Sequence, residues 1–438
     1  MSEPEEVYPL HNDVYESLTT SQKIQIALMT FTIVPIRIIL MVIVLAILWP
    51  LSILITYGQW DKMQHEPISG WRKSMYPLVR FVSRGLFFFA GMHYIKVYGE
   101  RDPKVRILTA APHSSFMDSI FIVYMNFISI IARAGSDQVT LFGNLTKMCH
   151  PILVNREKQQ SRSDTVNMLI ERVKSGDNWP QICIFPEGTC TNRKALVQFK
   201  TGAFIPGLPV QPVCVKYPSD RFDSISWTWK GPGAFETVWL TLCKFHSPVE
   251  IHFMPVYYPS DEEIKNPTLY ADNVRKLMAG HLRVPLSDYS YEDGILVKIL
   301  AKNGLPMQTG LVKIQKLRKK LGLSEMDDIL KIIPLYAQLA EKKTGLVQYD
   351  LFIENLGFEA GENASILFNM FDQERNGNFG LKNFIEVYFE KIQPVVRNSD
   401  LTDLILKNFD RDEYNSDEFN ALVRQRFGLQ LPQIQASK

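Results

Sequence analysis

The sequence has little of what would build a disulfide framework or a nucleic-acid surface. Its five cysteines are an odd number, lie far apart and include no CxxC pair. This pattern argues against a disulfide scaffold or a zinc knuckle and is typical of a reducing compartment. The 48 basic and 46 acidic side chains nearly cancel, leaving a net charge of +2. A nucleic-acid partner needs a concentrated basic face, so none is expected.

One long segment has no charge at all. The run IILMVIVLAILWPLSILITY, residues 38–57, has 20 residues, which is about the length that crosses a hydrocarbon core. We expect a membrane anchor rather than a cleavable signal peptide, because acidic residues precede the run and no small-residue cleavage site follows. Pro50 lies inside it, so a straight span and a re-entrant hairpin both stay open, with a buried soluble helix as a third alternative.

Basic residues are more frequent after this run than before it. Lys23 and Arg37 precede the run. The basic residues that follow it, up to residue 84, are Lys62, Arg72, Lys73, Arg80 and Arg84. The positive-inside bias therefore predicts that the main body of the protein faces the cytosol.

The residues after the anchor alternate between strand-like and helix-like segments. VRILTAA (105–111) and QICIF (181–185) are short apolar runs that stop at turn residues, as buried strands do. TVNMLIERVKSG (165–176) is an amphipathic helix with a glycine stop, and LPVQPVCVKY (208–217) is another strand. This alternation predicts an α/β domain over residues 66–290.

A histidine and an aspartate five places apart follow the first of these strands. A continuous helix turns about 100° per residue, so His113 and Asp118 would point about 140° apart and would not meet. Ser115 offers a solution, because a serine with an acid three places on is an N-cap signal. A helix that starts just after Ser115 and runs through residues 116–132 leaves His113 in the preceding turn. Asp118, in the first turn, can then fold back toward it.

This arrangement is chemically useful. A carboxylate that accepts the proton of one imidazole nitrogen fixes the tautomer and raises the basicity of the other nitrogen. His113 would then be a general base able to take a proton from a hydroxyl. Helix capping alone also explains Ser115 and Asp118, and that alternative stays open. A metal site has less support, because no other histidine or cysteine stands at ligand spacing.

Two further stretches present polar residues at predicted strand ends. In FPEGTCTNR, a strand runs into Pro186 and the chain turns at Gly188, which places Glu187 where α/β sheets bind ligands. Arg156 follows the apolar run ILVN, and its planar fork suits phosphate. The alternatives are a simple turn with a surface glutamate and a surface arginine.

The order of these motifs resembles the glycerophospholipid acyltransferases: H-x4-D, an arginine after an apolar strand, FPEGT, and a proline-bounded apolar strand. The similarity runs from about residue 105 to residue 290 and includes SWTWKGPGA and VEIHFMPVYYPS. Within that superfamily the sequence most resembles the lysophosphatidylcholine acyltransferases that carry EF-hands. That group includes the lyso-platelet-activating-factor acetyltransferases.

The resemblance implies a mechanism. His113 would be the general base and Asp118 its orienting partner. The base would deprotonate the free hydroxyl of a lysophospholipid, and the oxygen would attack the thioester of acyl-CoA or acetyl-CoA. Positions thought to hold the glycerol or phosphate region of the substrate are matched by Arg156, Glu187, Gly188 and the adjoining Thr189. A carboxylate is an odd phosphate ligand, so Glu187 would orient a hydroxyl or a basic neighbour.

The resemblance also implies partners and a location. Acyl-CoA would be the co-substrate, lysophosphatidylcholine the acceptor and the phospholipid bilayer a partner, with no cofactor required for the chemistry. The expected location is the endoplasmic reticulum membrane, with Golgi or lipid droplets as alternatives. Lysophosphatidic acid is an alternative acceptor. The rival from another class is an inactive, membrane-anchored calcium-sensing or interaction protein, which would predict erosion at His113, Asp118 or Glu187.

The C-terminal part of the sequence contains one EF-hand-like loop, DQERNGNFGLKN, residues 372–383. Gly377 stands at its turn position, and apolar helical segments flank it. Asn383 replaces the bidentate glutamate at the last position, which should weaken calcium binding greatly. A structural or protein-contact module and a calcium-regulated module both stay open. The candidate ligands are Asp372, Glu374, Asn376 and Asn378.

These patterns predict an α/β acyltransferase domain that follows a membrane-embedded helix or helical hairpin and precedes an all-α EF-hand-like domain. The predicted boundaries are an N-terminal tail and anchor at 1–65, the acyltransferase domain at 66–290, a basic linker helix at 291–318, the EF-hand-like domain at 319–425 and a flexible tail at 426–438.

Overall fold

The computed structural model describes residues 8–155, 159–175, 179–218, 221–306, 311–323, 326–356 and 362–392. The chain divides into two compact units, Met1–Tyr291 and Glu292–Lys438.

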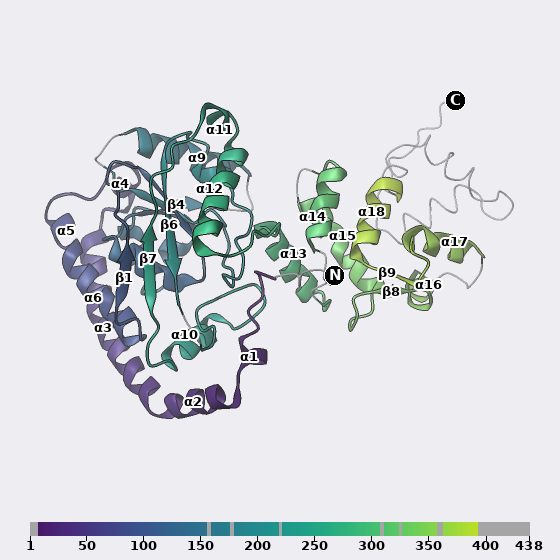
Figure 1. The fold of residues 1–438 in the computed structure, drawn as a ribbon, viewed down its shortest axis with the longest axis horizontal. Helices are drawn as coiled ribbons and strands as arrows, with labels where there is room; N and C mark the ends of the chain where they lie inside the picture. Colours follow the sequence, from purple (N-terminus) through teal and green to yellow (C-terminus); the bar gives the residue numbers. More distant parts are fainter. Residues whose placement is uncertain are drawn as a thin grey trace. The chain divides into compact units, whose positions relative to one another are not determined.

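A seven-stranded sheet lies at the centre of the first unit, in the order β1-β7-β6-β2-β5-β3-β4 (Figure 1). Every neighbouring pair is parallel except β6 with β7, so the sheet is mixed. The strands predicted over residues 105–111, 181–185 and 208–217 are confirmed as β2, β5 and β6. The strand bounds are β1 Ile95–Tyr98, β2 Ile107–Ala111, β3 Ser129–Arg133, β4 Ile152–Val154, β5 Ile182–Ile184, β6 Val210–Lys216 and β7 Val249–Phe253.

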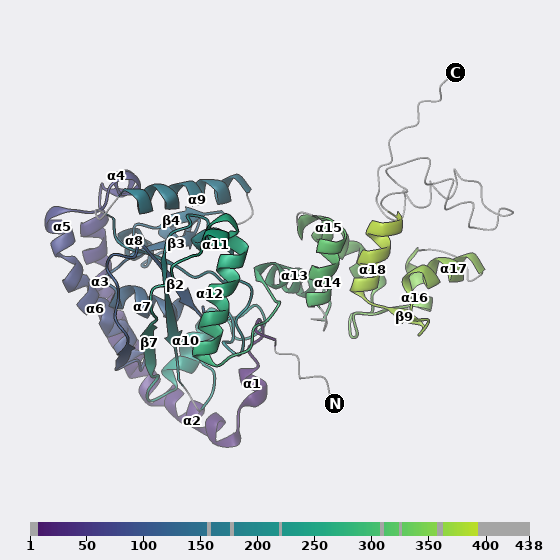
Figure 2. The ribbon, with the colours of Figure 1, turned by 45° about the horizontal axis from the view of Figure 1, so that its top comes forward.

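Helices cover both faces of this sheet, which is why β2 is buried at every position. Leu108 and Ala110 of β2 belong to a core cluster that includes side chains of α3 (Ile33–Thr56), α6 (Tyr76–Phe89) and α7 (Ser119–Tyr124). Ile107 and Ala111 belong to a second cluster with α9 (Gln159–Lys174) and α12 (Pro267–Leu282). Figure 2 shows α9 and α12 on the side of the sheet away from α3 and α6.

The apolar run is part of one continuous helix, α3, which passes through Pro50. Its most apolar window has a mean hydropathy of 3.0, and 17% of that window is buried, so α3 is a candidate membrane span by length and composition. Near its start, the Arg37 guanidinium donates to the carbonyls of Leu242 at 2.7 Å and Phe245 at 2.9 Å. Near its end, Ile55 shares a core cluster with Met148. The helix is therefore attached to the first unit near both ends.

The outer side of this helical layer is apolar. Exposed side chains on α3 include Ile39, Val42 and Ile43, and those on α6 include Phe81 and Phe88. Figures 1 and 2 both show α3 and α6 side by side on one face of the sheet.

The helix predicted over residues 116–132 is wrong beyond Tyr124. A short 3-10 turn, Phe116–Asp118, leads into α7, which ends at Tyr124. Asn126 and Phe127 then adopt positive φ angles of 60°, which a helix does not allow. The following residues form β3 and pair with β4 and β5. Isoleucines in this segment favour a strand, and pairing on both sides outweighs the helical pattern.

The remaining helices of the first unit complete its two layers. Their bounds are α1 Val14–Ser17, α2 Thr20–Phe31, α4 Trp60–His65, α5 Gly70–Ser74, α8 Gly143–Met148, α10 Ala234–Leu242 and α11 Asp261–Lys265.

Within its described residues, the second unit is helical apart from a short antiparallel pair of strands, β8 with β9. Aromatic side chains fill its core, among them Phe352, Phe371 and Phe384. The predicted flexible tail lies outside the described residues. The bounds are α13 Tyr291–Lys302, α14 Leu311–Lys320, α15 Met326–Leu339, β8 Val347–Gln348, α16 Tyr349–Leu356, α17 Glu362–Phe371, β9 Asn378–Phe379 and α18 Leu381–Val387, followed by a π-helical turn at Tyr388–Ile392.

Candidate active site

Three neighbouring parallel strands of the sheet, β5, β2 and β6, end at the same edge, and a polar side chain follows each. His113 follows β2, Glu187 follows β5 and Tyr217 follows β6. The carboxyl ends of parallel strands are where α/β sheets gather their functional groups. Here the sheet order brings together side chains that are far apart in the sequence.

His113 and Asp118 form the predicted pair. His113 Nδ1 lies 2.7 Å from Asp118 Oδ2. The same oxygen accepts the amide of Ser114 at 2.6 Å and that of Ser115 at 3.2 Å. The Ser115 hydroxyl in turn accepts the amide of Met117, which completes the predicted capping box. Capping and the His–Asp contact are therefore parts of one turn.

The other oxygen of Asp118 has its own donor. Asp118 is 1% exposed, and its Oδ1 accepts the Tyr217 hydroxyl at 2.7 Å. Burial and the adjacent carboxylate raise the pKa of Tyr217 well above its usual value, so the phenol keeps its proton. Asp118 is thus held as an acceptor from both sides.

The imidazole of His113 is partly open, with 25% of the side chain exposed. Its ring stacks on Phe185, with the centroids 4.3 Å apart. Burial lowers the pKa of His113, but Cys190 and Asp118 act in the opposite direction and raise it well above the usual value. Nδ1 faces Asp118, and the side chain of Cys190 also hydrogen-bonds to the imidazole.

Glu187 lies beneath the histidine turn rather than on the open side of the site. The side chain is fully buried, and its Oε2 accepts the backbone amide of His113 at 2.6 Å. Its Oε1 accepts the amide of Val197 at 3.4 Å. Burial raises the pKa of Glu187 to about 7, and the two amide bonds oppose that rise. The carboxylate ties the FPEGT loop to the backbone of His113, whereas the sequence had indicated a side chain turned toward a ligand.

Gly188 and Thr189 shape the same loop. Gly188 has a φ of +65°, and a Cβ there would meet Lys200 Cε at 3.2 Å. A glycine is favoured here because it accepts this backbone angle and leaves room for the lysine. Thr189 Oγ1 accepts the indole N–H of Trp229 at 2.7 Å.

The remaining predicted site residues divide between the described and undescribed parts of the chain. Arg156 lies outside the described residues, just after β4. In the second unit, Asp372 accepts the loop amides of Asn376 at 3.1 Å and Gly377 at 2.8 Å. Across the described ranges, no group of three or more His, Cys, Asp or Glu side chains is placed to hold a metal ion.

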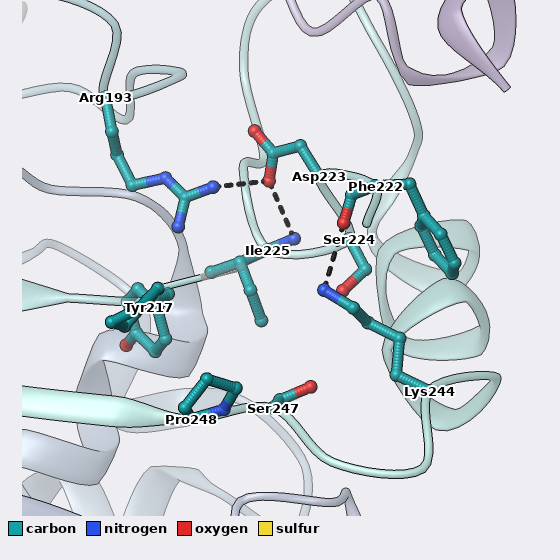
Figure 3. Close-up of a pocket in the computed structure, with 10 residues that line it drawn as sticks. Arg193, Tyr217, Phe222, Asp223, Ser224, Ile225, Lys244, Ser247 and Pro248 are labelled. Atoms are coloured by element: carbon teal, nitrogen blue, oxygen red, sulfur yellow. Dashed lines mark hydrogen bonds and ion pairs between the residues drawn. The ribbon is translucent and has the colours of Figure 1, made fainter. Parts of the chain in front are cut away.

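Two residues of the site were not predicted, Tyr217 and Arg193. The Arg193 guanidinium lies over the Tyr217 ring, 5.6 Å from its centroid, and its Nη2 donates to Asp223 Oδ1 at 2.7 Å (Figure 3). Both residues stand in stretches that the sequence had singled out. No spacing rule joins Tyr217 to Asp118, which is 99 positions away; its place just after a strand was the available signal.

Comparison with known proteins places this arrangement. Residues 94–216 match the family model described as Acyltransferase, a span that contains His113, Asp118 and Glu187. Lysophosphatidylcholine acyltransferase 1 of Mus musculus is 40% identical over 371 residues, which cover 84% of this chain and 69% of that protein. The chain belongs to the lysophosphatidylcholine acyltransferase family. It is therefore an acyltransferase, as the motif resemblance had implied.

Other members of the family match a larger share of the chain. Lysophosphatidylcholine acyltransferase 1 of Homo sapiens is 39% identical over 91% of this chain and 74% of its own length. Lysophosphatidylcholine acyltransferase 2 of Homo sapiens is 36% identical over 94% of this chain and 76% of its own length. The solved 1-acyl-sn-glycerophosphate acyltransferase of Thermotoga maritima is 18% identical, with a TM-score of 0.35 over 61% of this chain and 100% of that one.

Proposed function

We propose that this enzyme transfers an acyl group from acyl-CoA to the free hydroxyl of a lysophospholipid, with lysophosphatidylcholine as the acceptor. The observation that carries the proposal is the 2.7 Å contact between His113 and Asp118, within the residues that match the acyltransferase family. The names of the family members support the choice of acceptor. Lysophosphatidic acid is the alternative acceptor.

The proposed chemistry starts at His113. Asp118 keeps the proton on Nδ1, so Nε2 takes the proton of the substrate hydroxyl. The oxygen attacks the thioester carbon, the carbon–sulfur bond breaks, and the CoA sulfur leaves with the proton that His113 had taken. Only the neutral imidazole can take this proton, so activity should rise as the pH increases. The raised pKa of His113 moves that rise to higher pH than for an ordinary histidine. Acyl-CoA is the co-substrate, and the scheme needs no cofactor.

The other predicted residues take supporting roles in this proposal. We assign Arg156, which follows β4 in the sequence, a phosphate-binding role because its planar fork suits phosphate, and we assign the Gly188–Thr189 turn the substrate side of the loop. We assign Glu187 a positioning role, since its carboxylate holds the amide of His113.

We further propose that the outer face of α3 and α6 lies in the bilayer. Its exposed apolar side chains support this placement, and contacts near both ends of α3 favour a helix lying along the unit over one that leaves it. The expected location is the cytosolic side of the endoplasmic reticulum membrane, with Golgi or lipid droplets as alternatives. Ile39→Glu combined with Ile43→Glu should move the protein from the membrane to the soluble fraction. Unchanged sedimentation with membranes would contradict this placement.

For the C-terminal part we propose an EF-hand-like pair of helix–loop–helix elements. Its support is the β8–β9 pairing between the loops that precede α16 and α18 and the amides bound by Asp372. Asn383 stands where calcium sites place a bidentate carboxylate, so a chelator should change activity less than about twofold. The boundaries at residues 65, 290, 318 and 425 belong to this proposal.

The test is transfer of labelled acyl groups from acyl-CoA to a panel of lysophospholipids, using membranes that contain the wild type or His113→Ala at matched expression. We expect His113→Ala to lose activity about 100-fold or more, and the panel to name the acceptor. His65→Ala is the control, because His65 is exposed on α4 and its loss should not affect turnover. A wild type inactive on every acceptor would favour the inactive interaction protein instead.

A further inference from the structure

The contact between Tyr217 and Asp118 joins the H-x4-D motif to the end of the proline-bounded strand, and neither motif by itself indicates it. Tyr217 is the first residue after β6, and its hydroxyl donates to Asp118 Oδ1 at 2.7 Å. The three donors on the other oxygen, Oδ2, come from the turn between His113 and Ser115. Tyr217 is thus a donor to the carboxylate from a different strand of the sheet.

The Tyr217 ring itself is in contact with Arg193. Figure 3 shows Arg193 joined to Asp223 by a dashed line, and Asp223 joined in turn to the amide of Ile225. Arg193 Nη2 donates to Asp223 Oδ1 at 2.7 Å, and the same oxygen accepts the amides of Ile225 and Ser226, each at 3.1 Å. Arginine and aspartate are therefore fixed relative to the backbone, and the guanidinium lies against the Tyr217 ring.

We propose that Tyr217 is a positioning residue for the reaction: its hydroxyl holds Asp118 in place and limits how strongly Asp118 retains the proton of His113. Arg193, anchored by Asp223, keeps the phenol in that position. This inference rests on the proposed function of His113 as the general base. It adds a residue that acts through Asp118 and decides the pH at which the base becomes active.

The direction of the effect follows from the charges. A donor on Oδ1 spreads the negative charge of Asp118, so the carboxylate holds the His113 proton less tightly. Without the hydroxyl, Asp118 attracts that proton more, the imidazolium persists to higher pH, and the general base is scarcer at neutral pH. The titratable and charged groups that face the pair from the surrounding elements are Cys183, Glu187, Cys190, Arg193 and Tyr217. The variant Tyr217→Phe removes one hydroxyl and leaves the other four groups in place.

The experiment compares Tyr217→Phe with Tyr270→Phe across a pH series, measuring kcat and KM for acyl-CoA and lysophosphatidylcholine. Tyr270 is a matched control, because it is also a buried tyrosine of the first unit and its hydroxyl donates to the Leu208 carbonyl at 2.9 Å. For Tyr217→Phe we expect kcat at neutral pH to fall about five- to tenfold, with both KM values within about twofold of wild type. The rising limb of its pH profile should move upward by about half a unit to one unit.

Tyr270→Phe should leave the profile at its wild-type position. The proposal is overturned if Tyr217→Phe keeps the wild-type kcat and profile, or if the two variants lose activity alike without a shift in pH. If Tyr217→Phe fails to fold, Arg193→Lys supplies the test, because it keeps a charge for Asp223 but removes the flat group over the phenol. We expect a smaller shift in the same direction, and an unshifted profile would overturn the proposal.

The His113→Ala measurement separates this inference from the proposed function. Activity that survives His113→Ala would refute the general base, and the inference with it. Activity that is lost in His113→Ala but unaltered in Tyr217→Phe would refute the role of Tyr217 alone.

Discussion

Two aspartates, one in each unit of the chain, begin from the same local device. Asp118 accepts the amides of Ser114 and Ser115, and Asp372 accepts those of Asn376 and Gly377. Both are nearly fully buried, at 1% and 2% exposed. A carboxylate that accepts backbone amides fixes the shape of its turn.

The difference between them lies in what else reaches the carboxylate. Asp118 also binds two side chains, the imidazole of His113 and the phenol of Tyr217. Asp372 uses one oxygen for Asn376 and the other for Gly377, both from its own loop. In the proposed reaction, these two further contacts are what separate Asp118 from a carboxylate that only caps its own loop.

The largest effect should come from Asp118→Asn. The neutral amide of asparagine does not stabilise the imidazolium as a carboxylate does, and its NH₂ group can face Nδ1 instead of its oxygen. The proton is then no longer held on Nδ1 of His113. We expect kcat to fall about 10²- to 10⁴-fold. Asp372→Asn is the matched control and should keep activity within about twofold. Equal losses in the two variants would break the comparison.

Glu187→Gln tests whether the backbone amide of His113 needs the carboxylate of Glu187 as its acceptor. A glutamine oxygen can accept one of the two amides now bound by Glu187, while its NH₂ group faces the other. We expect activity to fall about tenfold, because the histidine turn loosens. Glu263→Gln is the control: Glu263 is 4% exposed and accepts the Ser260 amide at 2.8 Å. A variant Glu187→Gln with wild-type activity would contradict the positioning role.

The two units should also differ in how their stability depends on pH. Burial and then Arg172 lower the pKa of His150 from 6.5 to about 4. Because the unfolded chain binds this proton more readily, stability is full above about pH 6.5 and is lost as pH falls toward 4, by up to about 3 kcal/mol. Residues 292–438 contain no histidine, so the second unit lacks this contribution.

Thermal melting between pH 7 and pH 4.5 would measure that difference. His150 lies in the first unit, and its Nε2 accepts the Ile68 amide at 2.8 Å, a bond that protonation of Nε2 would remove. The variant His150→Gln should reduce the pH dependence of the melting temperature of the first unit. A dependence as steep as that of the wild type would assign it to other groups.

The smallest effect should come from Asp372→Ala. The variant removes the acceptor of two loop amides, which should destabilise the second unit by about 1–2 kcal/mol. Acyl transfer should stay within about twofold of wild type. The melting temperature and the transfer rate, measured on the same preparation, test both statements, and a large loss of transfer would tie this loop to the reaction.

The sequence by itself determined the local parts of this protein. The strands β2, β5 and β6 end at turn residues, and the N-cap at Ser115 with Asp118 in the first turn is present as the spacing indicated. The apolar run forms a helix, α3. These features follow from neighbouring residues, because capping, turn chemistry and hydrophobic period act over a few positions.

Only the tertiary structure decided the rest. The segment Ser129–Arg133 became a strand because two partners were available to it. The carboxylate of Glu187 turned inward to the amide of His113, and Tyr217 met Asp118, because β2 lies between β5 and β6. The spacing of residues along the chain does not predict this order of strands in the sheet. The order is set by how whole strands and helices bury their apolar faces together.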